Sequence, residues 1–122
     1  MVGRALKFAQ WRNPRNTRFD VLQSEIDDLR TFLSDGDVAI DIGAQVGDAT
    51  LPMAFACGPN GMVFAFEPNP FVFFVLARNA VLNPVKCNII AYSYAVTAKD
   101  GPMVVKYGGP DYQNGGENAA IL

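Results

Sequence analysis

Apolar residues recur at helical spacing in the first periodic segment of the chain, which runs from about residue 19 to residue 34. They are separated by four, three and four positions and are Leu22, Ile26, Leu29 and Leu33. This spacing places them on one face of a helix. Thr17 and Asp20 have the spacing of a capping box at its start. Gly36 suits the left-handed position that ends many helices, so the sequence predicts a helix over residues 19–34.

Short apolar runs then alternate with longer segments. The pattern predicts strands at 38–42, 62–66, 87–94 and 103–107, helices at 48–57 and 71–82, and a loop at 108–116. The segment 71–82 begins with strand-favouring residues. Its length and the preceding Pro68-Asn69-Pro70, which can start a helix, favour a crossover helix instead. Nearly continuous apolar strands that alternate with helices predict an α/β fold with a parallel sheet buried on both faces.

The composition of the chain allows one small domain. It has 122 residues, of which 50% are apolar and 18% are charged, enough for a core. There is no histidine and no CxxC pair, which excludes zinc-finger spacing and every nucleophile that relies on a histidine base. Cys57 and Cys87 lie in apolar stretches and are expected to be small buried hydrophobic residues.

Residues 1–18 carry five basic residues and no acid, while the whole chain has a net charge of −2. This segment could contact RNA or an anionic surface, or it could be a solvated terminal extension. Its arginine content also faintly suggests organelle import, although serines are scarce. We therefore divide the chain into a basic extension, 1–18, and a domain, 19–122. The longest apolar run, 71–77, is far too short for a membrane span, and a cytoplasmic protein is expected.

One constellation of residues carries chemistry. A glycine-bearing turn, Gly43 to Gly47, joins the strand 38–42 to the next helix, and Glu67 ends the neighbouring strand 20 residues after Gly47. Glycine permits the tight turn and a close ligand approach. A carboxylate at the tip of the adjacent strand can accept hydrogen bonds from both hydroxyls of a ribose. Together they indicate a nucleoside cofactor.

The charges near this turn indicate which cofactor. A dinucleotide fingerprint needs two further glycines, but Gln45 and Asp48 occupy those positions. A pyrophosphate at this helix start would be repelled by Asp48 and Asp41, by about 1 kcal/mol per charge at 4 Å in water. S-adenosylmethionine has no phosphate and carries an ammonium and a sulfonium, so acids suit it. Asp48 itself is interpreted as a helix N-cap rather than a ligand.

Four successive blocks of the chain resemble the FkbM-type S-adenosylmethionine-dependent methyltransferases. They are SEIDDLRTFLSDGDV (24–38), VAIDIGAQVGDATLPMAFACG (38–58), VFAFEPNPFVFFVLARNAVLN (63–83) and NIIAYSYAVTAKDG (88–101). The resemblance implies a three-layer, Rossmann-like class I methyltransferase fold. It also implies methyl transfer to a hydroxyl group of a small molecule or a sugar.

The same resemblance assigns roles to individual residues. Asp41, Gly43, Ala44 and Gly47 would line the methionine part of the cofactor. Glu67 would hold the ribose, with Pro68 and Asn69 shaping the adenine side and Ala95 close to the adenine. No residue can be nominated as a catalytic base, and no metal is expected.

The resemblance departs from the full family pattern near Leu122, ahead of the fourth principal strand. We therefore expect a fold truncated after its first three parallel strands, inactive as an isolated chain, with 38–42 as an open edge available for self-association or a partner. No DNA partner is expected. The alternative is a non-catalytic nucleotide-binding or scaffolding remnant that needs a partner to complete the sheet. A dehydrogenase is disfavoured by Asp48 and the absent glycines.

Overall fold

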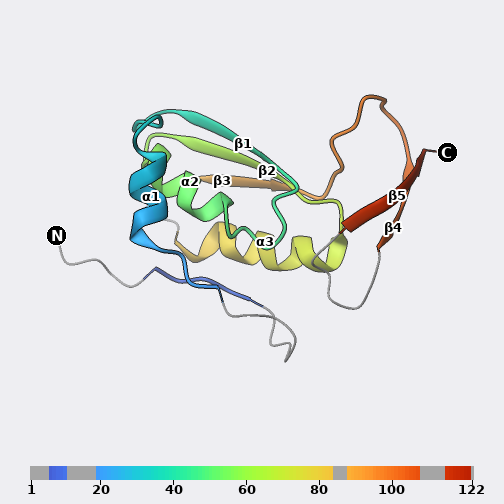
Figure 1. Ribbon diagram of the computed structural model, residues 1–122, viewed down its shortest axis with the longest axis horizontal. Coiled ribbons are helices and arrows are strands. Elements are labelled where there is room, and N and C mark those ends of the chain that lie inside the picture. The colour runs from blue at the N-terminus through green and yellow to red at the C-terminus, as the bar shows by residue number, and fades with distance from the viewer. Residues whose placement is uncertain (1–5, 11–18, 84–87, 108–114, 122) are drawn as a thin grey trace.

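The computed structural model describes residues 6–10, 19–83, 88–107 and 115–121. Its elements follow in the order α1 (Gln23–Leu29), β1 (Val38–Ile42), α2 (Thr50–Cys57), β2 (Met62–Phe66), α3 (Pro70–Leu82), β3 (Ile89–Tyr92), β4 (Met103–Tyr107) and β5 (Gly115–Ile121) (Figure 1). The alternation of strands and helices from α1 to β3 confirms the predicted α/β class.

Three strands form one parallel sheet in the order β1-β2-β3. Ile40 of β1 lies opposite Phe64, and Ile42 lies opposite Phe66, which in turn pairs with Tyr92 of β3. Since all three strands are parallel, their carboxyl ends lie along the same edge of the sheet. In the described part of the chain β1 pairs with β2 alone, so it is an edge strand, as predicted.

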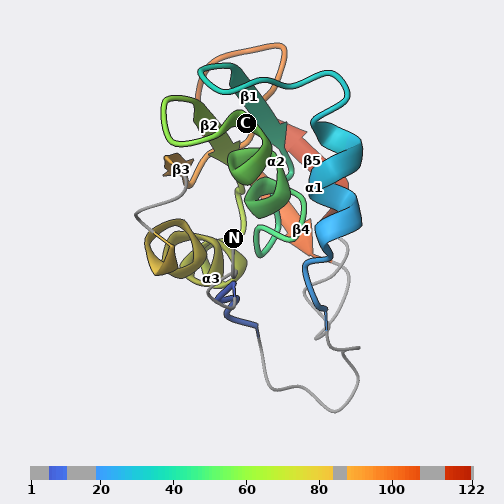
Figure 2. The same cartoon turned by 90° about the vertical axis from the view of Figure 1, so that its left-hand side faces the viewer.

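The helices α1, α2 and α3 lie on one side of this sheet (Figure 2). α1 packs against α2, and the contacts of α2 and α3 with the sheet bury Leu51 and Cys57 of α2, Val63 of β2 and Leu76 of α3, each fully. The prediction of burial is therefore confirmed for Cys57, whereas Cys87 lies outside the described residues. No helix in the described ranges is both long and apolar enough to cross a membrane.

The opposite face of the sheet is uncovered by the described residues. Val38, Ile40 and Ile42 point to that side and are 60%, 63% and 62% exposed. Phe64, Phe66 and Tyr92 form a stacked aromatic row beside them. The sequence predicts strands buried on both faces between two helical layers. The described helices supply one of those layers, so they cover only one face of β1.

Helix α1 is shorter than the predicted 19–34. Leu22 is extended at its N-cap position, and its backbone N–H donates to the Glu25 carboxylate at 2.9 Å. The regular helix ends early because the N–H groups of Thr31 and Phe32 donate to carbonyls three residues back, Asp28 O and Leu29 O, each at 3.1 Å. Thr17, and with it the predicted capping box, lies outside the described residues. Gly36 has the predicted left-handed backbone, with φ of 98°.

The segment after Pro68 forms helix α3, as predicted, although its first residues favour strands by intrinsic propensity. Asn69 caps the helix by accepting a hydrogen bond from Phe71 N–H at 3.0 Å, and Pro70 occupies the first helical position. The helix then connects two parallel strands, as predicted.

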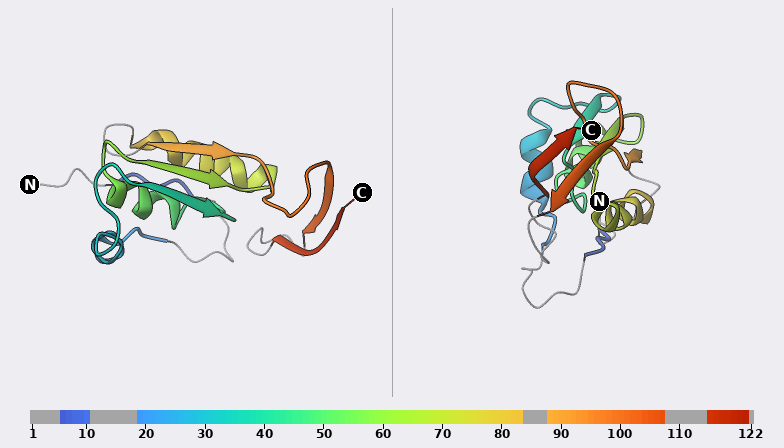
Figure 3. Two further views of the ribbon diagram at one scale, coloured as in Figure 1. Left: turned by 90° about the horizontal axis from the view of Figure 1, so that it is seen from above. Right: turned by 90° about the vertical axis from the view of Figure 1, so that its right-hand side faces the viewer.

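A second, two-stranded sheet lies beyond the carboxyl ends of the parallel strands (Figure 3). It consists of β4 and β5 in antiparallel pairing, with a register shift between Lys106 and Tyr107. The strand at 103–107 is confirmed, but β5 was not predicted, and the predicted loop 108–116 is wrong at its last two residues. The segment 115–121 contains glycines and alanines without alternating β-branched residues, so its sequence carries no strand signal.

Candidate functional site

The turn between β1 and α2 has a left-handed backbone at three positions: Gly43 (φ 78°), Gln45 (φ 50°) and Gly47 (φ 94°). The N–H groups of Gly43 and Ala44 both donate to Phe66 O at 2.9 Å, which ties the turn to the end of β2. A Cβ placed on Gly47 would lie 3.0 Å from Leu76 Cδ1. Glycine at this position therefore provides both the backbone conformation and the close packing on α3.

Glu67 lies beside this turn, at the carboxyl end of β2. Its Oε2 accepts a hydrogen bond from Gln45 N–H at 3.0 Å, and its Oε1 accepts one from Asn69 N–H at 2.8 Å. The side chain is 7% exposed. Each carboxylate oxygen has a further lone pair, so Glu67 can still accept bonds from a ligand. The structure thus brings together the predicted turn and the predicted ribose acid.

The other predicted residues divide between the turn and its supports. Asp41 is 9% exposed and accepts a hydrogen bond from Thr50 Oγ1 at 2.5 Å, which connects β1 to the first turn of α2. Asn69 is 2% exposed and serves as the cap of α3. Ala44 is buried within the turn, and Pro68 is half-buried beside Glu67. Ala95 lies exposed three residues after β3, so it remains the loosest of the predicted assignments.

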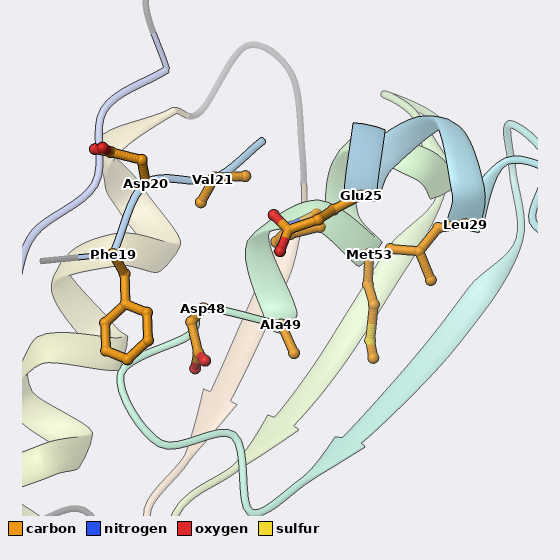
Figure 4. A pocket seen from close by; sticks show the side chains of 9 residues that line it. Phe19, Asp20, Val21, Glu25, Leu29, Asp48, Ala49 and Met53 are labelled. Carbon is orange, nitrogen blue, oxygen red and sulfur yellow. The ribbon is translucent and has the colours of Figure 1, made fainter. Parts of the chain in front are cut away.

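Asp48 follows the turn and faces a small cavity. The cavity has a volume of about 330 Å³ and lies between residues 19–21, α1 and the start of α2 (Figure 4). Its walls combine apolar side chains with three acids: Phe19, Val21, Leu29, Ala49, Pro52 and Met53, with Asp20, Glu25 and Asp48. This cavity does not include Glu67 or the glycines, so it adjoins the turn only through Asp48.

The environment of Asp48 raises the pKa of its carboxyl above the ordinary value. Burial is the main cause, and the negative charges of Asp41 and Glu25 add to it, while backbone N–H groups of Asp48 and Ala49 oppose it. The prediction that Asp48 is the N-cap is wrong by one residue, because Ala49 holds that position. Ala49 has helical backbone angles, and its N–H donates a hydrogen bond to the Asp48 carboxylate.

Asp48→Asn is expected to gain stability relative to the wild type as the pH rises from about 3 to about 7. The raised pKa means that ionising Asp48 costs more in the folded than in the unfolded chain, and asparagine avoids this cost while still accepting a backbone N–H. Urea unfolding of both proteins at the two pH values measures the difference. An identical pH dependence of the two unfolding free energies would contradict the proposed cause.

Two residues at this site were not predicted. Gln45 donates the backbone bond to Glu67, but its sequence position between two glycines gave no sign of a left-handed conformation. Asn79 is 1% exposed in α3, and its side chain donates to Val46 O of the turn at 2.7 Å. A lone polar residue within an apolar helix is a usable signal, because buried polar groups need partners.

Comparisons with known proteins bear on this site. A family model described as the methyltransferase FkbM domain matches residues 41–121, a range that contains every predicted site residue. No curated protein matches the chain. A candidate rRNA-methylase from Clostridium thermocellum is 20% identical with a TM-score of 0.49, covering 66% of this chain and 45% of that chain. A candidate transferase from Pyrococcus horikoshii is 26% identical with a TM-score of 0.49, covering 59% and 27%. The chain thus spans less than half the length of both solved structures.

Proposed function

The chain belongs to the methyltransferase FkbM domain family, and we propose that its glycine turn and Glu67 bind S-adenosylmethionine as the methyl donor. We further propose that the acceptor is a hydroxyl of a small molecule or a sugar. The family match covers the strand end, the turn and Glu67 in one continuous segment.

The hydrogen bond from Gln45 N–H to the Glu67 carboxylate is the observation that carries this proposal. It fixes the Glu67 carboxylate, the acid proposed to bind the ribose, directly against the turn that follows the first strand, at the carboxyl end of a parallel sheet. Open α/β sheets bind their ligands at this edge. A Cβ placed on Gly43 would meet no atom within 4 Å, so the outer side of the turn is open to a ligand.

The electrostatics of the site favour a cation. Asp41 and Glu25 lie close enough to Asp48 for their charges to raise the pKa of its carboxyl. Glu67 adds a further carboxylate, directly beside the turn. This negative potential opposes a pyrophosphate and stabilises an ammonium or a sulfonium. These carboxylates therefore suit S-adenosylmethionine better than they suit a dinucleotide.

Bound S-adenosylmethionine supplies a methyl group on a positively charged sulfur, which an acceptor oxygen can attack in line. The residues of this chain act by holding and orienting that donor. Glu67 accepts hydrogen bonds from the ribose hydroxyls, and the turn fixes the amino-acid end. Proximity and orientation of donor and acceptor can supply much of the rate, so the proposal assigns no base.

Calorimetric titration of the chain with S-adenosylmethionine, S-adenosylhomocysteine and NAD tests the proposal. We expect binding of the first two and none of NAD, because the acids beside the turn repel its pyrophosphate. Failure of all three ligands to bind would overturn the proposal and favour a scaffolding role instead. Preferential NAD binding would contradict the electrostatic argument.

A further inference from the structure

Asn79 forms three hydrogen bonds that join two distant parts of the chain. Its Oδ1 accepts from Ala9 N–H at 2.6 Å, and its Nδ2 donates to Ala9 O at 2.9 Å. The same Nδ2 donates to Val46 O at 2.7 Å. An amide NH₂ has two hydrogens, so these bonds use both of them. Asn79 thus contacts the glycine turn on one side and the N-terminal segment on the other.

The N-terminal segment 6–10, which we call the strap, runs along α3 (Figures 1 and 2). Asn83 lies one helical turn after Asn79 and holds the strap in the same way, accepting from Lys7 N–H at 3.1 Å and donating to Lys7 O at 2.8 Å. Leu6 and Phe8 pack against the hydrophobic core. Part of the predicted 1–18 extension is therefore docked on the domain, although the division at residue 18 stays a prediction.

On the other side, Asn79 supports a strained section of backbone. Val46 lies between Gln45 and Gly47, and both of these neighbours have positive φ. A backbone in sparsely populated conformations persists only when surrounding contacts hold it. The bond from Asn79 to Val46 O is such a contact, because it fixes the carbonyl in the middle of the turn.

We propose that Asn79 is a positioning residue that couples docking of the strap to donor binding at the glycine turn. The proposal rests on the function proposed above. Two of the three bonds of Asn79 go to Ala9, so the strap fixes the plane of the amide and aims its remaining N–H at Val46 O. Loss of the strap frees the amide to rotate and loosens the turn. By thermodynamic reciprocity, a donor that orders the turn also strengthens docking of the strap.

Ala9→Pro tests the coupling from the strap side. It removes the N–H that bonds to Asn79 Oδ1 and leaves every side chain of α3 and of the turn in place. We expect about tenfold weaker binding of S-adenosylmethionine by calorimetry, the equivalent of one net hydrogen bond. Lys7→Ala is the matched control, because that exposed side chain leaves the backbone bonds to Asn83 intact, and it should bind as the wild type does. Asn79→Ala removes all three bonds and should weaken binding at least as much as Ala9→Pro.

Hydrogen exchange of the wild type provides a readout that a merely structural Asn79 would not change. Bound S-adenosylmethionine should slow exchange of the Lys7 and Ala9 amides, although neither residue belongs to the proposed donor site. Unchanged exchange on donor binding, or wild-type affinity in Ala9→Pro, would overturn the coupling while leaving the proposed function intact. A wild type that binds no S-adenosylmethionine would overturn both.

Discussion

Replacing Glu67 by alanine is expected to weaken S-adenosylmethionine binding about a hundredfold. The variant would lose the proposed charge-assisted hydrogen bonds to the ribose hydroxyls, each worth about 1.5–3 kcal/mol. It also leaves the N–H groups of Gln45 and Asn69 without their carboxylate partner, because these donors bond to Oε2 and Oε1. The glycine turn thereby loses the hydrogen bond that connects it to the side chain at position 67. Titration calorimetry at one fixed ionic strength measures the effect.

Two further variants show which property of Glu67 matters. Glu67→Gln keeps the shape of the side chain and one carbonyl acceptor, so its affinity should lie between those of the wild type and Glu67→Ala. Asp28→Ala removes an exposed acid of α1, distant from the turn in the chain, and serves as the charge control. Equal losses in Asp28→Ala and Glu67→Ala would mean that net charge, rather than the position of the carboxylate, governs binding.

Gly61→Ala is expected to lower the free energy of unfolding by about 3 kcal/mol, at the upper end of overpacking effects. A Cβ at this position would lie 2.4 Å from Cys57 O and 2.6 Å from Asp37 O. Both are backbone atoms, so no flexible side chain can move away. Met62 N–H also donates to Asp37 O at 3.1 Å next to this point, so any backbone shift disturbs the start of the β1–β2 pairing. Urea unfolding measures the loss.

Gly36→Ala separates crowding from backbone strain. Gly36 has a φ of 98°, but a Cβ there would meet no atom within 4 Å. Alanine therefore suffers only the conformational strain, about 1 kcal/mol. Gly61 shows the reverse situation, since the clash arises there without a left-handed backbone. Similar losses of unfolding free energy in the two variants would show that the backbone around Gly61 shifts enough to accommodate the added methyl group.

The parallel sheet and its glycine turn could be predicted because their signals are local. Val38–Ile42 and Met62–Phe66 are short apolar runs bounded by turns, and both strands form at the predicted residues. The turn and Glu67 meet because carboxyl ends of parallel strands share an edge, which topology alone dictates. Helix α3 required weighing propensity against connectivity, and connectivity decided the outcome.

The rest of the site depends on contacts between residues far apart in the chain. Asn79 bonds to Ala9 across 70 positions, and no periodic pattern encodes such a pairing. Gln45 adopts a left-handed backbone because the bonds of its neighbours to Phe66 O and of its own N–H to Glu67 enforce it. The sequence also predicts two covered faces for β1, whereas burial of a strand face depends on which other segments pack on it.

The uncovered face of the sheet also affects the thermodynamics of unfolding. The heat capacity change of unfolding grows with the apolar surface that unfolding newly exposes to water. Val38, Ile40 and Ile42 already meet water in the folded chain, so they contribute little to that change or to the denaturant sensitivity of stability. The stability curve of this chain is therefore flatter with temperature than that of a domain of equal length whose sheet is covered on both faces.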